Sequence, residues 1–454
     1  MTCLACFKSY DIRGRVGDEL TEALALRIGA AFVKVTGATH LVVGHDCRAS
    51  SPALSSAVAQ GAMAAGADVS GIGQCGTEEV YFATDHLGAG GGLMITASHN
   101  PISDNGIKLI GKGATPVSQD QLQRIHDLVV SDAPLTAPNT GSATAADPRA
   151  AYCDRVLSFV DPAALRPMRI VVNAGNGTAG PTFDALADAL AETAAPLEFI
   201  RLHHNPDPTF PNGIPNPLLP ENRPVTADAV RAHQADLGIA WDGDFDRCFF
   251  FDEAGEFVDG EYIVGLLAAA MLDRAPGGRI VHDPRVQWNT LAEVARAGGK
   301  PEVSRTGHVL IKETMRRVDA VYGGEMSAHH YFRDFMYCDS GMIPWLLVAA
   351  RMSALDQPLS AIIAGMRASF PSSGEINFRV SDADAAIDAV TRRMLGGALK
   401  TDHLDGLSAE FDDWRFNLRR SNTEPLLRLN IEARGNPALV AETLARFRAF
   451  LDGA

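Results

Sequence analysis

Three aspartates at alternate positions follow an apolar run and give the clearest chemical signal in the sequence. Asp242, Asp244 and Asp246 lie in the segment Asp-Gly-Asp-Phe-Asp-Arg. Carboxylates this close repel one another unless a cation lies between them, and hard oxygen ligands suit Mg²⁺ or Ca²⁺. An EF-hand loop is one alternative, but Arg247 stands where that loop needs glycine. A solvated acidic turn is another, which the neighbouring Trp241 argues against. We therefore predict a metal site.

A serine marks a second candidate site. Ser98 follows the strand-like run Gly92–Thr96 by two residues, and Pro101 prevents the strand from continuing. A serine in this position is an exposed candidate nucleophile, although it lacks the G-x-S-x-G pattern of hydrolases. His99 is adjacent and could act as a base, but neighbouring side chains on an extended backbone diverge. Taken alone, a Ser-His pair is more typical of a turn.

Three further polar segments could bind a sugar phosphate. The turn from Arg419 to Thr423 gathers guanidinium, hydroxyl and amide donors, which suit phosphate, although a hydrogen-bonded turn with solvated arginines is the default interpretation of this segment taken alone. The segment Glu325–His329 follows two glycines at a strand end and could bind sugar hydroxyls. Thr306-Gly-His308 is predicted to open a helix, which places His308 near its positive end.

A glycine pattern carries a competing hypothesis. Gly175-Asn-Gly-Thr-Ala-Gly180 is a full G-x-G-x-x-G between a predicted strand and a helix, as in dinucleotide-dependent oxidoreductases. Glu198 lies at the expected distance for a ribose ligand, but it begins the next strand instead of ending it. A tight turn with close helix packing is the preferred interpretation.

The elements that position these residues alternate between strands and helices. Short β-branched runs, glycine-rich turns and amphipathic helices repeat along most of the chain, which predicts α/β domains built from βαβ units. Residues 131–149 have the composition of a linker. A second boundary is predicted near Asp252–Gly255, and the pattern changes near Ser369–Ser373 to a closing α+β unit.

Composition excludes several classes of protein. The 454 residues include 40 Lys and Arg against 55 Asp and Glu, so the net charge is −15. Nucleic acid and anionic membranes are therefore unexpected partners. Apolar runs are too short to span a bilayer. Seven cysteines without paired CxxC motifs, and no secretory signal, predict a cytoplasmic protein with reduced thiols.

The order of these segments resembles the α-D-phosphohexomutase family, and within it the bacterial phosphomannomutases and phosphoglucomutases. The matching segments are Tyr10–Gly14, Thr96–Pro101, Asp242–Arg247, Thr306–His308, Glu325–His329 and Arg419–Thr423. The resemblance implies three related α/β domains with mixed sheets and a C-terminal α+β domain around a central cleft. The implied domains are 1–148 with the phosphoserine loop, 149–253 with the metal loop, 254–369 with the sugar loop and 370–454 with the phosphate clamp.

The resemblance also implies a role for each matching residue. Ser98 is the phosphoserine, and Mg²⁺ is held by Asp242, Asp244, Asp246 and a phosphate oxygen on Ser98. Lys108 and His308 transfer protons, and Arg247 lies beside the phosphoserine. The substrate-binding residues are Glu325, Ser327 and His329 for the sugar, Arg419, Ser421, Asn422 and Thr423 for the distal phosphate, together with Tyr10, Arg13 and Arg285. Arg285 stands where relatives carry Lys.

The implied reaction interconverts mannose 6-phosphate and mannose 1-phosphate through a phosphoserine enzyme and a hexose 1,6-bisphosphate, and it feeds GDP-mannose and polysaccharide synthesis. Small hexose phosphates are the implied partners, without an obligate protein partner. The alternatives are a phosphoglucomutase or dual-specificity mutase, a catalytically inactive sugar-phosphate binder with the same fold and, distantly, a dinucleotide-dependent oxidoreductase.

Overall fold

The computed structural model describes residues 4–131, 133–193, 195–420 and 426–451. It comprises two compact units, the first formed by Met1–Phe257 with His329–Asp356 and the second by Val258–Ala328 with Gln357–Ala454.

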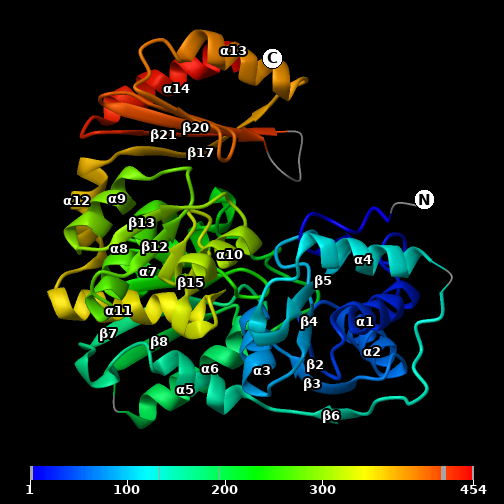
Figure 1. The fold of residues 1–454 in the computed structure, drawn as a ribbon. Coiled ribbons are helices and arrows are strands. Elements are labelled where there is room, and N and C mark those ends of the chain that lie inside the picture. Colours follow the sequence, from blue (N-terminus) through cyan, green and yellow to red (C-terminus); the bar gives the residue numbers. More distant parts are fainter. Residues whose placement is uncertain (1–3, 132, 194, 421–425, 452–454) are drawn as a thin grey trace. The chain divides into compact units, whose positions relative to one another are not determined.

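The first unit begins with a mixed six-stranded sheet and its helices. Their bounds are β1 (Ile12–Arg15), α1 (Glu22–Thr36), β2 (His40–His45), α2 (Ser51–Ala64), β3 (Asp68–Gln74), α3 (Thr77–His86), β4 (Gly91–Ile95), β5 (Asp104–Gly111), α4 (Gln119–Val130) and β6 (Ala143–Ala145). The strand order is β1-β5-β4-β2-β3-β6, with β5 antiparallel to both of its neighbours and the other pairs parallel. α1 and α2 cover one face of the sheet and α3 covers the other (Figure 1). The Ser98 loop leaves the end of β4.

A second mixed sheet carries the triple-aspartate loop. Its elements are α5 (Arg149–Leu157), β7 (Met168–Asn173), α6 (Ala179–Glu192), β8 (Leu197–Leu202), α7 (Pro224–His233), β9 (Leu237–Trp241), β10 (Cys248–Phe251) and β11 (Phe257–Val258). β7, β8 and β9 are parallel, and β10 returns antiparallel to β9. Every residue of β9 is buried, as is typical of a strand covered on both faces. The aspartates form the turn between β9 and β10.

The first unit ends with a short hairpin and a buried helix. These elements are β15 (His330–Phe332), β16 (Cys338–Asp339) and α11 (Met342–Leu355). Most side chains of α11 are buried, including Trp345. Within the described residues, no single helix is long and apolar enough to cross a membrane; only α11 together with α12 (Leu359–Ser369) reaches that length and hydropathy.

The first turn of α3 joins the two sheets of the first unit. Glu78 accepts hydrogen bonds from the Tyr152 hydroxyl on α5 and from the Gly341 amide, the latter at 2.6 Å. Glu79 accepts from Thr182 on α6 at 2.9 Å and from Arg149 on α5 at 3.1 Å. Both glutamates are buried. α3 is therefore anchored to the second sheet by side chains that belong to neither candidate site.

Replacing Glu78 by glutamine is expected to change how stability depends on pH. Burial raises the pKa of Glu78 to about 8. Between the ordinary carboxyl pKa and that value, the unfolded chain releases a proton that the folded chain retains, so the free energy of unfolding falls as pH rises, by up to about 1.4 kcal/mol per pH unit. Glu78→Gln removes this slope, and its melting temperature relative to wild type should increase from pH 5 to 8.5. Glu313→Gln, at an exposed position, is the control for removing a surface carboxyl. A pH profile for Glu78→Gln that runs parallel to that of the wild type would contradict the expectation.

The second unit begins with three parallel strands. Its first elements are α8 (Gly260–Arg274), β12 (Arg279–His282), α9 (Trp288–Arg296), β13 (Lys300–Val303), α10 (His308–Val318) and β14 (Ala320–Gly324). β12 lies between β13 and β14 and runs parallel to both. α10 begins at His308, as the sequence predicts.

An antiparallel sheet closes the second unit. Its elements are β17 (Ser372–Arg379), α13 (Ala383–Met394), β18 (Lys400–Asp402), β19 (Leu407–Glu410), β20 (Trp414–Arg420), β21 (Leu426–Ala433) and α14 (Pro437–Leu451). The order is β17-β21-β20-β19-β18 with both helices on one face (Figure 1). Glu432 on β21 accepts the Gln287 and Trp288 amides at the start of α9, at 2.7 and 2.9 Å. The α/β fold class with mixed sheets is confirmed, and one detail differs from expectation: β6 pairs with β3 inside the segment interpreted as a linker.

Candidate active site

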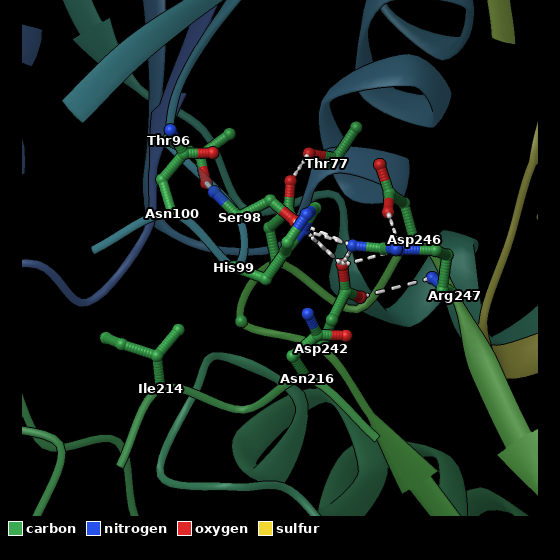
Figure 2. A network of polar contacts seen from close by, with 12 residues as sticks. Thr77, Thr96, Ser98, His99, Asn100, Ile214, Asn216, Asp242, Asp246 and Arg247 are labelled. Atoms are coloured by element: carbon green, nitrogen blue, oxygen red, sulfur yellow. Dashed lines mark hydrogen bonds and ion pairs between the residues drawn. The ribbon is translucent and has the colours of Figure 1, made fainter. Parts of the chain in front are cut away.

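Ser98 lies at the centre of a buried hydrogen-bond network. Its Oγ donates to Asp242 Oδ2 at 2.7 Å and lies 3.4 Å from Arg247 Nη2 (Figure 2). His99 Nδ1 also lies 3.0 Å from the same Oγ, so the expectation that the two side chains diverge is wrong. The reason is the backbone at Ser98, which has φ 51° instead of an extended conformation. A left-handed serine is strained and turns its hydroxyl toward the aspartates.

The Ser98 loop is held in this conformation by an arginine that the sequence analysis did not single out. Arg48 is 2% exposed, and it donates to the carbonyl oxygens of Ser98 and Asn100 at 2.9 and 2.7 Å. It also donates to the carbonyls of Pro101 and Asp104 at 2.8 and 2.9 Å. One planar guanidinium thus fixes four carbonyls of a single loop.

The three aspartates converge as the spacing predicts. All are buried, and one ligand atom from each lies within 4.8 Å of the other two. Asp244 Oδ1 and Asp246 Oδ1 are buried and accept no hydrogen bond from the described residues, whereas their Oδ2 atoms do. Oxygen atoms left without donors in a buried acidic cluster fit a hard divalent cation such as Mg²⁺.

Two cations balance the carboxylates. Arg247 donates to Asp242 Oδ2 from Nε at 2.9 Å and Nη2 at 2.7 Å. Lys108, on β5, donates to Asp244 Oδ2 at 2.7 Å and to Asp246 Oδ2 at 2.5 Å. Three carboxylates face two fixed cations, which leaves the cluster one negative charge in excess when all three are ionised.

The pKa values follow from burial and from these partners. Burial raises the pKa of Asp242 to about 6 although Arg247 opposes the change. Burial is also the largest single influence on Asp246, but the positive charges of Lys108, His329 and Arg247 together outweigh it and lower the pKa to about 2. Burial lowers the pKa of Lys108, yet the charges of Asp244 and Asp246 raise it above its ordinary value. Burial, and then Arg247, hold the pKa of His99 well below its usual range, so its imidazole is neutral.

Arg13 reaches the Ser98 loop from β1, and His329 reaches the metal loop. Arg13 Nη1 donates to Asn100 Oδ1 at 2.9 Å, while Tyr10 is half-buried just before the strand. His329 Nδ1 lies 3.0 Å from Asp339 Oδ2 and 3.9 Å from Asp246 Oδ1. The resemblance groups His329 with Glu325 and Ser327, but the structure assigns His329 to the first unit and the other two to the second.

In the second unit, Arg285 gathers the polar residues of the sugar loop. Its Nη2 lies 2.7 Å from Asp283 Oδ2, 3.2 Å from Ser327 Oγ and 3.7 Å from Glu325 Oε1. Glu325 accepts the Gly307 amide at 3.0 Å, directly before His308. Arg285 is 3% exposed, so its guanidinium is committed to these carboxylates.

A carboxylate that the sequence analysis missed draws three arginines together. Glu375 on β17 lies 3.1 Å from Arg419 Nη2, 3.1 Å from Arg428 Nη1 and 3.5 Å from Arg285 Nη1. Arg285 also pairs with Asp283, whereas Arg419 and Arg428 both pair with Glu375; two guanidinium groups that share one carboxylate suit a phosphate. The other predicted clamp residues, Ser421, Asn422 and Thr423, lie outside the described residues.

The glycine-rich turn after β7 packs against the backbone of the same chain at Gly243. Thr178 donates to the Gly243 carbonyl from both its amide and its hydroxyl, each at 3.1 Å. A Cβ on Gly177 would lie 2.7 Å from Gly243 O, and one on Gly180 would lie 1.9 Å from His204 O. These glycines therefore permit close backbone contact, which favours the packing interpretation over dinucleotide binding.

Residues missed by the sequence analysis are those that act through packing. Thr77, Arg48 and Glu375 contact predicted site residues from elements far away in sequence, whereas Asp339 contacts His329 from the neighbouring strand β16. The pattern Asp46-Cys-Arg48 at a strand end was the only available signal, since an acidic and a basic residue at that edge of a parallel sheet indicate a site.

Comparison with known proteins gives consistent results over the whole chain. The phosphoglucomutase/phosphomannomutase family models match in four parts, domain I over 5–134, domain II over 150–255, domain III over 259–370 and the C-terminal domain over 375–450. A relative from Xanthomonas campestris named "Phosphohexose mutases" is 55% identical and covers 96% of this chain and 97% of that protein. A phosphomannomutase from Salmonella typhimurium is 54% identical and covers 98% of each chain.

Solved structures give the same result as the sequence comparisons. A phosphoglucomutase/phosphomannomutase family protein from Burkholderia thailandensis is 32% identical, with a TM-score of 0.87 over 100% of this chain and 99% of that one. A structure described as a phosphomannomutase from Thermus thermophilus, 24% identical, shares the fold with a TM-score of 0.83 over 98% of this chain and 100% of that one. With four family domains in order and an acidic triad beside a buried serine, this chain belongs to the phosphoglucomutase/phosphomannomutase family.

Proposed function

We propose that this chain is a phosphomannomutase that interconverts mannose 6-phosphate and mannose 1-phosphate. The observation that carries the proposal is the 2.7 Å hydrogen bond from the Ser98 hydroxyl to Asp242 of the acidic triad. The names of relatives about half identical over nearly the whole chain support the substrate. We propose that the product, mannose 1-phosphate, is used to form GDP-mannose and polysaccharide.

We propose that Asp242, Asp244, Asp246 and an oxygen of phosphorylated Ser98 hold Mg²⁺. When bound, the ion offsets the negative charge that develops on the transferring phosphoryl group. The buried Oδ1 atoms of Asp244 and Asp246 support this ligand set.

The phosphoryl group passes from Ser98 Oγ to a hydroxyl oxygen of the sugar. One P–O bond to Ser98 breaks and one P–O bond to the sugar forms, while the sugar hydroxyl loses a proton and Ser98 Oγ gains one. The hexose 1,6-bisphosphate then turns end for end. Its other phosphoryl group passes to Ser98 Oγ, which releases a proton, while the P–O bond to the sugar breaks and the sugar oxygen takes up a proton. Arg247 lies 3.4 Å from Oγ and is proposed to stabilise the charge during both transfers.

Lys108 and His308 are the proposed proton-transfer residues. The raised pKa keeps Lys108 protonated, so its ammonium group can donate a hydrogen bond to a sugar oxygen and offset negative charge there. The proposed substrate-binding residues are Tyr10, Arg13, Arg285, Glu325, Ser327, His329, Arg419, Ser421, Asn422 and Thr423.

The proposed domains have the boundaries 1–148, 149–253, 254–369 and 370–454. We propose that the enzyme acts in the cytoplasm on hexose phosphates, without nucleic acid, membrane or obligate protein partners.

We expect mannose phosphate to be the main substrate, with some turnover of glucose phosphate and little of N-acetylglucosamine phosphate. Glu325 and Ser327 are proposed to bind the O3 and O4 hydroxyls, which mannose and glucose share, so these contacts do not reject glucose. An acetamido group at C2 needs added room and a donor. Coupled assays with the three hexose 1-phosphates measure kcat/KM for each. A higher kcat/KM for N-acetylglucosamine phosphate than for mannose phosphate would overturn the substrate assignment but leave the mutase mechanism intact.

Glu325→Ala extends the same test. Because the proposed contact is common to both hexoses, kcat/KM should fall about 10- to 100-fold for each, the scale of a lost hydrogen bond to a charged group. Glu302→Ala, in the same unit, serves as control. A loss confined to one hexose would contradict the shared contact.

The dinucleotide alternative is tested by titrating the protein with NADH, for which we expect no binding.

A further inference from the structure

Thr77 occupies the first position of α3 and contacts the metal loop directly. Its hydroxyl lies 2.6 Å from Asp244 Oδ2 and 3.1 Å from Lys108 Nζ, and all three side chains are buried. Its amide donates to the Asp244 carbonyl at 3.1 Å. Thr77 therefore binds one aspartate through both its backbone and its side chain.

The direction of these hydrogen bonds is fixed by chemistry. An ammonium group has only donors, so Lys108 must donate to the Thr77 oxygen. The single hydroxyl proton of Thr77 is then left for Asp244 Oδ2. That oxygen also accepts from Lys108 at 2.7 Å, whereas Asp244 Oδ1 accepts nothing from the described residues. Two donors on one carboxylate oxygen fix the orientation of the group and leave the other oxygen for a ligand.

The position of Thr77 is determined independently of the metal loop's own carboxylates. Gly76 precedes it, and a Cβ on Gly76 would lie 2.1 Å from the Phe245 ring, so the helix start and the loop are in close contact. Glu79 accepts the Gly76 amide at 2.9 Å and, like Glu78, is anchored to the second sheet. The first amides of a helix have no partner within the helix, which leaves the Thr77 amide available to Asp244.

We propose that Thr77 is a positioning residue for the metal site: it orients the Asp244 carboxylate toward the cation and fixes Lys108 beside it. The inference rests on the proposed function, because it takes Asp244 as a ligand of Mg²⁺. Outer hydrogen-bond partners of this kind typically change metal affinity about 10- to 100-fold when they are removed.

The test compares Thr77→Val, which keeps the shape and removes the hydroxyl, with Thr77→Ser, which restores it. Calorimetric titration of metal-free protein with Mg²⁺ should give a dissociation constant raised about 10- to 100-fold in Thr77→Val and near the wild-type value in Thr77→Ser. Thr84→Val is the matched control: Thr84 is equally buried on the same helix, but its hydroxyl donates to Val80 O at 2.7 Å. Its Mg²⁺ affinity should be unchanged.

Unchanged Mg²⁺ affinity in a folded Thr77→Val protein would overturn the inference and leave the proposed function intact. If Thr77→Val does not fold, Thr77→Ala takes its place, and the same outcome applies to it. Failure of the wild-type protein to bind Mg²⁺ would instead overturn the metal site and this inference together. The Mg²⁺-dependent rise in melting temperature, expected to be smaller in Thr77→Val than in Thr84→Val, is a second readout independent of turnover.

Discussion

Ser98→Ala is expected to lower kcat by at least about 10⁴-fold, the scale of loss when a covalent nucleophile is removed. The physical reason is that, among the described residues, Ser98 carries the one hydroxyl hydrogen-bonded to Asp242, so its removal leaves no hydroxyl at that position to accept the phosphoryl group. A coupled assay with mannose 1-phosphate measures the rate, and peptide mass analysis of active wild-type enzyme should locate a phosphate on Ser98.

Ser103→Ala provides the control, because Ser103 lies in the same loop but is exposed. Its rate should remain close to that of the wild type. Full activity of Ser98→Ala, or phosphate found on another serine of the active enzyme, would contradict the mechanism.

Asp244→Asn is expected to abolish most turnover and to weaken Mg²⁺ binding strongly, while the protein remains folded. Asparagine keeps the shape of the side chain and can still accept from Thr77 at the Oδ2 position, but it removes one of three charges from the cluster. Mg²⁺ titration and the coupled assay measure the two effects. Removal of metal from wild-type enzyme with EDTA should reduce turnover to a similar extent, and added Mg²⁺ should restore it.

Asp228→Asn, at an exposed position of α7, is the matched control and should bind Mg²⁺ like the wild type. An undiminished rate in EDTA would show that the three aspartates serve a structural purpose. In that case the Ser98 prediction would still stand, because it does not depend on the identity of the cation.

The sequence predicted the α/β class because its signals are local. Buried parallel strands appear in a sequence as short apolar runs, and the residues that follow them have the composition of turns. The ends of β4 and β9 could therefore be located without a structure. The aspartates were equally visible, since three carboxylates at alternate positions after a strand have few other physical explanations. Helix α10 starts at His308 because the preceding glycine favours a break there.

The contacts of the site depend on residues far apart in the chain, and the sequence does not encode their pairing in any local pattern. Ser98 bonds to Asp242 because β4 and β9 belong to two sheets that α3 holds together. The left-handed backbone at Ser98 brings His99 to the hydroxyl. This conformation is stabilised by the hydrogen bonds that Arg48 donates to four carbonyls of the loop. No propensity predicts such a conformation for serine, because it is unfavourable without those partners.

The tertiary structure also decided which residues of one motif act together. Glu325 and His329 are four positions apart, yet the chain crosses from the second unit to the first between them, and His329 contacts Asp339 and Asp246. What the sequence alone determined was therefore the chemistry available: a serine, three carboxylates and clusters of arginine at strand ends. What only the tertiary structure decided was which of these groups touch, because hydrogen bonds such as that from Thr77 to Asp244 form between segments that meet only after the sheets have packed.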